Sequence, residues 1–333
     1  MPLLNSGIFS NTDSTDKTVR SLGESEVIER IRQWLGSVTP ATPLGIGDDC
    51  AIIETPAGMK QLLTTDSITY GQHIDGSVGA KDAGSKLIKR NVSDIAAMGG
   101  EPGPALLNLL MGPDVSIKWL EAFISGVKEA SARYRISIVG GDMSELEAGH
   151  FSAALTLLGT AKQKPLLRHT AAISDWIFVT GTLGGSILGK HYAFEPRLIE
   201  GQWLAKQEEV TSMMDLTDGL GKDLAAILPD HASAEIETKR LPISSDARTF
   251  EQQDGKAAVE HAFCDGEDYE LLFTLSTAAD IDLFESDWKK EFPELELSRI
   301  GRITKAHPEG RYIDATTKKP LNWATGFEHF KKR

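Results

Sequence analysis

Short apolar runs alternate with stretches of helical periodicity along both halves of the chain, and this alternation limits the possible folds more than any other feature. Because strands and helices are interleaved and do not gather in separate blocks, we expect an α/β or α+β fold. A chain of 333 residues is long enough to bury two hydrophobic cores of ordinary size. We therefore expect two domains, with the boundary at the start of the segment 162–171.

The predicted N-terminal domain covers residues 21–161, and the predicted C-terminal α/β domain covers residues 162–333. Residues 1–20 are rich in Ser, Thr, Asn and Asp without apolar periodicity, so we expect a flexible tail there. In the first half, the pattern predicts helices over 24–35, 81–98 and 119–134, and strands over 50–53, 61–65, 136–139 and 151–158. In the second half, it predicts strands over 176–180, 213–216, 269–275 and 299–303, and helices around 186–190 and over 220–228. Turn residues around Pro56 and Gly58 join the first two strands, which is typical of a β-hairpin.

Charge and composition exclude several classes of function. The formal net charge is −13, whereas broad binding to nucleic acid or to an anionic membrane needs a surplus of Lys and Arg. No apolar run approaches the roughly 20 residues needed to span a bilayer, and the first 20 residues lack the apolar core of a secretion signal. The only cysteines, Cys50 and Cys264, are too few for a disulfide framework or a four-cysteine zinc site. We expect a cytoplasmic protein with no nucleic-acid or membrane partner.

Aspartates beside Gly, Ser or Thr follow predicted strands or precede predicted helices at several places. They are Asp48, Asp49, Asp66, Asp94, Asp142, Asp215 and Asp218. Magnesium prefers hard oxygen ligands and is usually held by one or two carboxylates together with substrate phosphates. Any one of these residues is equally well explained as a helix N-cap or a turn residue. The neighbours Asp48 and Asp49 would repel each other unless water or a cation lies between them.

Other motifs carry weaker signals. Gly184, Gly189 and Lys190 have the spacing of a nucleotide-hydrolase phosphate loop, but His191 stands where a Ser or Thr would hold magnesium, so we reject that interpretation. His73 follows a predicted strand and could contact a phosphate, although a lone His is more often structural. Arg168 is the best placed cation for nucleotide phosphates, although a solvated Arg is the default.

Seven motifs together resemble the thiamine-monophosphate kinase family, in the superfamily that also contains aminoimidazole ribonucleotide synthetase and selenophosphate synthetase. They are GIGDDCAII (45–53), TTDS (64–67), NVSDIAAMGGEP (91–102), VGGD (139–142), DLTDGL (215–220), GEDYELLF (266–273) and GFEHF (326–330). The resemblance runs from about residue 23 to residue 330. It implies ATP-dependent phosphorylation of thiamine monophosphate to thiamine diphosphate, with several Mg²⁺ ions, in a homodimer whose N-terminal domains pair their sheets.

The resemblance also implies a role for each matching residue. The implied metal ligands are Asp49, Thr64, Thr65, Asp66, Asp94, Asp142, Asp215 and Asp218. The implied ATP contacts are Gly141, Asp142, Arg168 and Thr217, and the implied catalytic carboxylates are Asp94, Asp142 and Asp215. His73 and Glu267 would meet thiamine monophosphate, and Phe327 would stack on one of its rings.

The chain departs from the family pattern at a few positions. Ile74 replaces an aromatic residue, Asp265 replaces a glycine, and Met143-Ser144 replaces two threonines. Thr217 stands where the family has Ser and keeps the hydroxyl. Ile74 and Asp265 bear on substrate affinity more than on activity.

Other functions of the superfamily stay open to different degrees. Residues 1–44 contain no Cys, which selenophosphate synthetase requires, and the chain ends Lys331-Lys332-Arg333, not in the Cys of hydrogenase-maturation relatives. An aminoimidazole ribonucleotide synthetase and a non-catalytic ATP- and metal-binding relative are the remaining alternatives. For the kinase, we expect direct in-line attack of the acceptor phosphate on the γ-phosphorus, because positioning and charge neutralisation supply most of the catalysis.

Overall fold

The computed structural model describes residues 22, 24–35, 44, 47–55 and 59–327. The chain divides into two units, one of which is described only at residues 22 and 24–35, while the other spans residues 41–327. In the first unit, helix α2 (Glu24–Leu35) has the predicted bounds. The predicted tail over 1–20 lies outside the described residues. Both predicted domains fall largely within the second unit, so the boundary between residues 161 and 162 stays a prediction.

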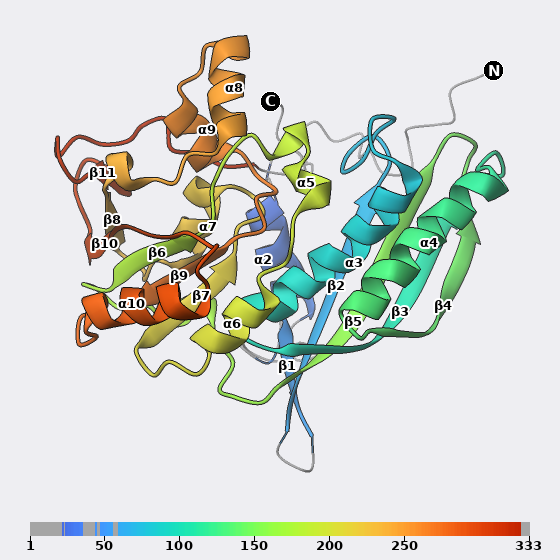
Figure 1. Ribbon diagram of the computed structural model, residues 1–333, viewed down its shortest axis with the longest axis horizontal. Helices are drawn as coiled ribbons and strands as arrows, with labels where there is room; N and C mark the ends of the chain where they lie inside the picture. Colours follow the sequence, from blue (N-terminus) through green and yellow to red (C-terminus); the bar gives the residue numbers. More distant parts are fainter. Residues whose placement is uncertain (1–21, 23, 36–43, 45–46, 56–58, 328–333) are drawn as a thin grey trace. The chain divides into compact units, whose positions relative to one another are not determined.

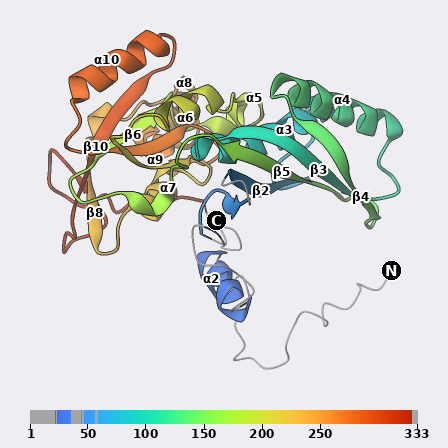
Figure 2. The same cartoon turned by 90° about the horizontal axis from the view of Figure 1, so that it is seen from below.

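The first sheet of the second unit is mixed and has the strand order β1-β2-β5-β3-β4. Its strands are β1 (Ala51–Glu54), β2 (Lys60–Thr69), β3 (Glu101–Met111), β4 (Ser137–Glu145) and β5 (Phe151–Ala161). Strands β3 and β4 are parallel, and the other neighbours are antiparallel. The helices α3 (Ala80–Ala97) and α4 (Ile117–Arg133) lie side by side over one face of this sheet (Figures 1 and 2).

Close packing fixes α3 and α4 against each other and against the sheet. A Cβ on Gly84 would lie 2.0 Å from the carbonyl oxygen of Phe123, and one on Gly126 would lie 1.8 Å from that of Lys81. Only glycine therefore allows the two helices to approach this closely. Alternate residues of β5, among them Leu155 and Leu157, are buried in the core beneath the helices.

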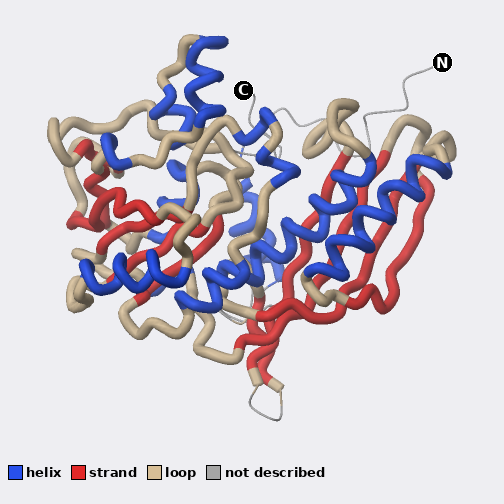
Figure 3. Tube along the Cα trace, in the orientation of Figure 1, coloured by secondary structure: helices blue, strands red, loops and turns tan. Residues whose placement is uncertain are grey.

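The second sheet has the order β11-β8-β10-β6-β9-β7. Its strands are β6 (Trp176–Thr180), β7 (Val210–Asp215), β8 (Ala232–Ile236), β9 (Leu271–Leu275), β10 (Leu297–Lys305) and β11 (Tyr312–Asp314). The accompanying helices are α5 (Lys190–Ala193), α6 (Leu198–Leu204), α7 (Leu220–Ile227), α8 (Ser245–Asp254), α9 (Ala258–Cys264) and α10 (Ile281–Glu291). Figure 3 shows the strands gathered in two groups with helices around them. The interleaved α/β class predicted from the sequence is confirmed.

Two predicted elements differ from the structure. The strand expected over 136–139 continues through the two glycines as far as Glu145, so Asp142 lies inside β4 and does not follow its end. A Cβ on Gly141 would lie 1.7 Å from the carbonyl oxygen of Leu107, so glycine is needed for the close pairing of β4 with β3. The helix expected around 186–190 is a 3₁₀ turn (Ser186–Leu188) followed by α5, because Gly189 adopts φ 148° and interrupts it.

Several elements were not predicted, and β3 is the most important of them. It begins with Glu101-Pro102-Gly103-Pro104, a composition that argues against a strand because proline cannot donate to the ladder. The prolines lie where the register between β3 and β5 shifts, which explains why they are tolerated. Among the described residues, no helix has the length and apolar character needed to cross a membrane.

Candidate active site

Three carboxylates from distant parts of the chain lie together in the second unit. Asp49 precedes β1, Asp94 lies in the last turn of α3, and Asp215 ends β7. One carboxylate oxygen of each lies within 4.8 Å of those of the other two. The sequence therefore predicted correctly that aspartates from both halves converge. We call this group the aspartate cluster.

Hydroxyl groups hold two carboxylates of the aspartate cluster in place. Thr64 Oγ1 donates to Asp94 Oδ2 at 2.5 Å, and Ser93 Oγ donates to Asp215 Oδ2 at 2.5 Å. The predicted ligand Thr64 thus lies at the cluster, whereas Ser93 was not singled out. Its signal was its place directly before Asp94 on a predicted helix.

Burial dominates the electrostatics of the cluster. Burial and then the charge of Asp49 raise the pKa of Asp215 to about 8. Burial, followed by the charges of Asp66, Asp215 and Asp49, raises the pKa of Asp94 well above its ordinary value. These shifts mean that the buried negative charge is incompletely balanced by the protein itself. An all-oxygen donor set with excess negative charge fits a divalent cation such as Mg²⁺.

Arg168 partly balances this charge. Its guanidinium forms a two-pronged ion pair with the carboxylate of Asp49, with Nε donating to Oδ2 at 3.0 Å. The backbone N–H of Arg168 donates to Asp48 Oδ2 at 3.1 Å. Burial and then the charge of Asp49 raise the pKa of Asp48 to about 6. The structure places Arg168 at the cluster, and its predicted contact with ATP stays a prediction.

The two residues that follow Thr64, Thr65 and Asp66, are placed differently. Asp66 pairs with Arg90, whose Nε lies 3.0 Å from Asp66 Oδ2. Burial raises the pKa of Asp66 more than the Arg90 cation lowers it, so this pKa lies above its ordinary value. Asp66 is also close enough to Asp94 for its charge to affect the pKa of Asp94. The hydroxyl of Thr65 instead donates to the carbonyl oxygen of Leu155 at 3.0 Å, away from the aspartate cluster.

Within one chain, Gly141 and Asp142 are not brought to the aspartate cluster. Both lie on β4, which β5 and β3 separate from β2 in the sheet. The carboxylate of Asp142 is exposed and accepts a hydrogen bond from Ser144 Oγ at 3.0 Å. The roles of both residues at ATP and metal stay predictions.

The loop between β7 and α7 contains Thr217 and Asp218, and a buried carboxylate holds it. Asp223 Oδ2 accepts hydrogen bonds from the backbone N–H groups of Thr217 at 2.9 Å and Asp218 at 3.0 Å. The carboxylate of Asp218 lies 2.7 Å from the ammonium of Lys222. Asp223 was not singled out, although an acidic residue in the first turn of a predicted helix is a known signal of this arrangement.

The residues predicted to meet thiamine monophosphate lie near the same region. Lys86 Nζ is 2.8 Å from Glu267 Oε1 and also donates to the carbonyl oxygen of His73 at 2.8 Å. The backbone N–H of Phe327 donates to the carbonyl oxygen of Asp218 at 2.7 Å. The structure thus brings His73 and Glu267 together through one lysine, and attaches Phe327 to the loop that contains Asp218.

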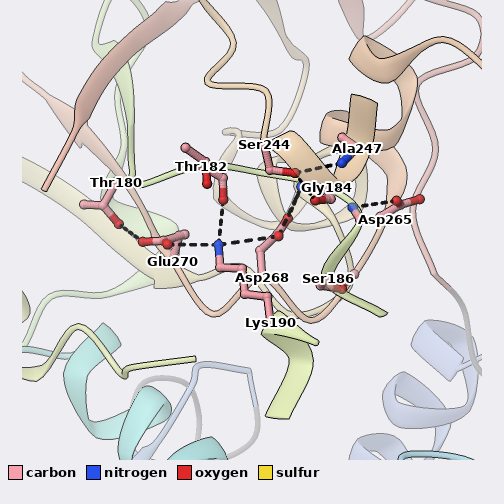
Figure 4. A network of polar contacts seen from close by, with 12 residues as sticks. Thr180, Thr182, Gly184, Ser186, Lys190, Ser244, Ala247, Asp265, Asp268 and Glu270 are labelled. Carbon is pink, nitrogen blue, oxygen red and sulfur yellow. Dashed lines mark hydrogen bonds and ion pairs between the residues drawn. The ribbon is translucent and has the colours of Figure 1, made fainter. Parts of the chain in front are cut away.

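A buried polar network anchors the segment 266–270, which contains Glu267 (Figure 4). The carboxylate of Glu270 accepts from Thr180 Oγ1 at 2.8 Å and from Lys190 Nζ at 2.9 Å. The carboxylate of Asp268 accepts from the backbone N–H of Gly184 at 3.1 and 3.0 Å. Burial raises the pKa of Asp268 to about 7, although Lys190 opposes this shift. The network fixes the residues that directly follow Glu267.

The two departures expected to bear on substrate affinity, Ile74 and Asp265, both have clear structural places. Ile74 is 4% exposed and belongs to the core beneath α3. The carboxylate of Asp265 accepts from the backbone N–H of Gly185 at 2.9 Å and lies 3.0 Å from His261 Nδ1. Both residues therefore contribute contacts within the protein, and their effect on substrate affinity stays a prediction.

Comparisons with known proteins agree with this geometry. A family model described as AIR synthase related protein, N-terminal domain, matches residues 47–161. The thiamine-monophosphate kinase of Rhodopirellula baltica is 34% identical over 87% of this chain and 92% of the relative. The thiamine-monophosphate kinase of Haemophilus influenzae is 32% identical over 94% of this chain and 99% of the relative. A solved structure of AaThiL complexed with AMPPCP and TMP has a TM-score of 0.79 and 29% identity, and the match covers 95% of this chain and 100% of that one.

These similarities extend over almost the whole length of both partners, and the aspartate cluster with its partner Thr64 joins residues of four of the seven motifs noted in the sequence. The chain belongs to the thiamine-monophosphate kinase family.

Proposed function

We propose that the chain transfers the γ-phosphate of ATP to thiamine monophosphate, giving thiamine diphosphate and ADP. The observation that carries this proposal is the convergence of Asp49, Asp94 and Asp215 in a chain of this family. Relatives named thiamine-monophosphate kinase support the reaction, and the similar structure of AaThiL complexed with AMPPCP and TMP supports the two substrates.

Asp49, Asp94 and Asp215 are the residues that would hold Mg²⁺, with Asp66, Thr64, Thr65, Asp142 and Asp218 as further predicted ligands. When bound, Mg²⁺ offsets the negative charge of two phosphorylated molecules that must approach each other. Thr64 and Ser93 orient the carboxylates of Asp94 and Asp215, so the cluster needs little rearrangement to act as a ligand set. Arg168 then lies where it can pair with a phosphate in exchange for Asp49.

The acceptor needs little activation by the protein. A phosphate monoester has a second pKa of about 6, so its oxygen is largely ionised at neutral pH and requires no strong general base. We propose direct in-line transfer, in which an oxygen of thiamine monophosphate bonds to the γ-phosphorus as the bond to ADP breaks. Inversion at a chiral γ-phosphate is the expected result, and retention or a labelled enzyme intermediate would contradict it.

We also propose that the enzyme is a homodimer that pairs the N-terminal sheets. Strand β4 is an edge strand, and its side chains Val139 and Met143 are 64% and 66% exposed, with Leu106 of β3 at 47%. Exposed apolar residues along a sheet edge favour association with a second copy. Gly141 and Asp142 lie on β4, so in such a dimer they would act near the interface. Light scattering of the wild type and of Val139→Glu tests this: a dimer that dissociates supports it, and a monomeric wild type contradicts it.

One assay tests the proposed reaction against its rivals. The purified protein is incubated with ATP, Mg²⁺ and one of three acceptors, namely thiamine monophosphate, thiamine or formylglycinamidine ribonucleotide, and the products are separated by chromatography. We expect thiamine diphosphate only from thiamine monophosphate. Turnover of the ribonucleotide would indicate a synthetase, and ATP binding without turnover would indicate a non-catalytic relative. The cytoplasm is our proposed location, because the reaction consumes ATP, and cell fractionation tests it.

A further inference from the structure

One buried cation next to the predicted substrate residues has no role in the reaction described so far. Lys86 lies on α3, and its side chain is 0% exposed. An ammonium group has three N–H donors. In this protein the three acceptors are the carbonyl oxygen of His73 at 2.8 Å, His191 Nδ1 at 3.0 Å and Glu267 Oε1 at 2.8 Å.

These acceptors come from three separate segments of the chain. His73 lies in the turn between β2 and α3, His191 lies on α5, and Glu267 lies in the segment before β9. Burial, followed by the charge of Lys86, lowers the pKa of His191, so the imidazole is neutral and its Nδ1 accepts a hydrogen bond from Lys86. Lys86 is therefore the point at which both predicted substrate residues are tied to one helix.

The contact with Glu267 also sets the charge of that residue. Burial acts to raise the pKa of Glu267, but the Lys86 ammonium, its hydrogen bond and the Arg90 cation outweigh burial and lower the pKa below its ordinary value. The groups that act on this carboxylate are Lys86, Arg90, His191, Tyr269 and Asp66. Lys86 is the only cation among them that is within 3 Å of Glu267 in the described residues.

The backbone of Glu267 is held in an unusual conformation that requires such support. Glu267 and Tyr269 have φ values of 62° and 52°, in the left-handed region that non-glycine residues rarely adopt. The backbone N–H of Glu267 donates to the carbonyl oxygen of Thr217 at 2.7 Å, and the ring of Tyr269 stacks on Phe194 at 3.7 Å between centroids. The backbone is thus fixed by these contacts, and the Glu267 side chain is held by Lys86 at 2.8 Å and by the hydroxyl of Tyr269 at 3.2 Å.

We propose that Lys86 is a positioning residue for thiamine monophosphate, which holds the turn containing His73 and the carboxylate of Glu267 in fixed positions relative to each other. This inference rests on the proposed function, because that function assigns His73 and Glu267 to the substrate. Lys86 is fully buried and does not itself touch the substrate. Its loss should therefore weaken binding of thiamine monophosphate and leave binding of ATP almost unchanged.

The test compares Lys86→Met with Lys89→Met. Lys89 is a matched control because it is a second buried lysine on α3, and its ammonium donates to the carbonyl oxygens of Tyr192 and Phe194, both at 2.7 Å, in and beside α5. It has no described contact with His73 or Glu267. Steady-state kinetics at saturating Mg²⁺ give kcat and KM for both substrates. We expect Lys86→Met to raise KM for thiamine monophosphate about tenfold or more, and Lys89→Met to change it less than about threefold.

A second variant separates charge from packing. Lys86→Gln keeps a side-chain donor for the carbonyl oxygen of His73 but removes the positive charge, so it should fold even if Lys86→Met does not. Without the cation the pKa of Glu267 rises, so a larger fraction of Glu267 is protonated as the pH falls. Both proteins should show some rise in KM for thiamine monophosphate between pH 8 and pH 5.5, because the acceptor phosphate itself becomes protonated near pH 6. We expect the rise to be several-fold larger in Lys86→Gln than in the wild type.

Each outcome decides between specific claims. Wild-type protein that does not phosphorylate thiamine monophosphate overturns the proposed function. If the wild type is active and Lys86→Gln has the same KM for thiamine monophosphate as the wild type at every pH, the role of Lys86 is overturned and the proposed function stands. An equal rise of KM for ATP and for thiamine monophosphate, or the same rise in Lys89→Met, also overturns it, because either result indicates general damage to the fold.

Discussion

Replacing Asp94 by Asn should stabilise the metal-free protein and inactivate the enzyme. Two unit charges 4.8 Å apart repel each other by about 3.5 kcal/mol at an effective dielectric constant of about 20. Arg168 and partial protonation of the cluster offset much of this repulsion, so we expect a net gain of about 2 kcal/mol for Asp94→Asn at pH 8.5 with a chelator. For a chain of this size that gain corresponds to a rise in Tm of about 3 °C.

With Mg²⁺ and both substrates present, the same substitution removes a charged ligand. We expect kcat to fall well over tenfold, which corresponds to a barrier raised by more than about 1.4 kcal/mol. Differential scanning calorimetry with and without Mg²⁺ measures the first effect, and a coupled ADP assay measures the second. The control is Asp287→Asn, on the exposed face of α10 where it pairs with Lys290, and it should change neither quantity.

A Tm of Asp94→Asn below that of the wild type, both measured with a chelator, would refute the electrostatic reasoning. That result would mean that the hydrogen bond between Asp94 and Thr64 stabilises the metal-free fold more than the repulsion within the aspartate cluster destabilises the fold. Near-normal turnover of the variant at saturating Mg²⁺ would refute the assignment of Asp94 to the metal.

Three further predictions concern the fold and the loops of the site. Gly126→Ala should destabilise the protein by about 2 kcal/mol in chemical denaturation, because its Cβ would lie 1.8 Å from the carbonyl oxygen of Lys81, whereas Gly76→Ala, whose Cβ would lie 3.6 Å from the hydroxyl of Tyr70, should be nearly neutral; equal effects would contradict this. Asp268 has a folded-state pKa of about 7, above the ordinary 3.8, so the folded protein binds this proton more tightly than the unfolded chain, and the stability from this group is lost as the pH rises through 7. Asp268→Asn should therefore reduce the fall in unfolding free energy between pH 5.5 and 8.5. The same fall in the variant as in the wild type would count against this argument. Asp223→Ala should raise KM for ATP several-fold, because two backbone N–H groups of the loop containing Thr217 lose their acceptor; KM values equal to the wild type would show that the loop does not depend on Asp223.

The sequence was most informative where a residue's place in its element determines its surroundings. Asp49 and Asp215 lie at ends of strands, and Asp94 lies on the buried face of a long amphipathic helix, so their convergence could be predicted from pattern and motif order. The bounds of α3 and β6 were likewise predicted closely, because periodicity is a strong signal in long or fully apolar segments.

Other features depend on contacts that no local pattern reports. The prolines of β3 argued against a strand, and only the register shift beside β5 accommodates them. Asp142 was expected after a strand end, but Gly140 and Gly141 continue β4, so its carboxylate is exposed and distant from the aspartate cluster. A lysine in a helix is normally solvated, and nothing near Lys86 in the sequence indicates that three distant segments enclose it.

The central claim is that acidic side chains from both halves of the chain hold divalent cations between two phosphorylated substrates. Crystals grown with Mn²⁺ in place of Mg²⁺, a non-hydrolysable ATP analogue and thiamine monophosphate test it through the anomalous signal of the metal. We expect an anomalous peak about 2.1 to 2.2 Å from carboxylate oxygens of Asp49, Asp94 and Asp215, next to the phosphates. Fully occupied substrates with manganese peaks only elsewhere in the protein would contradict the account.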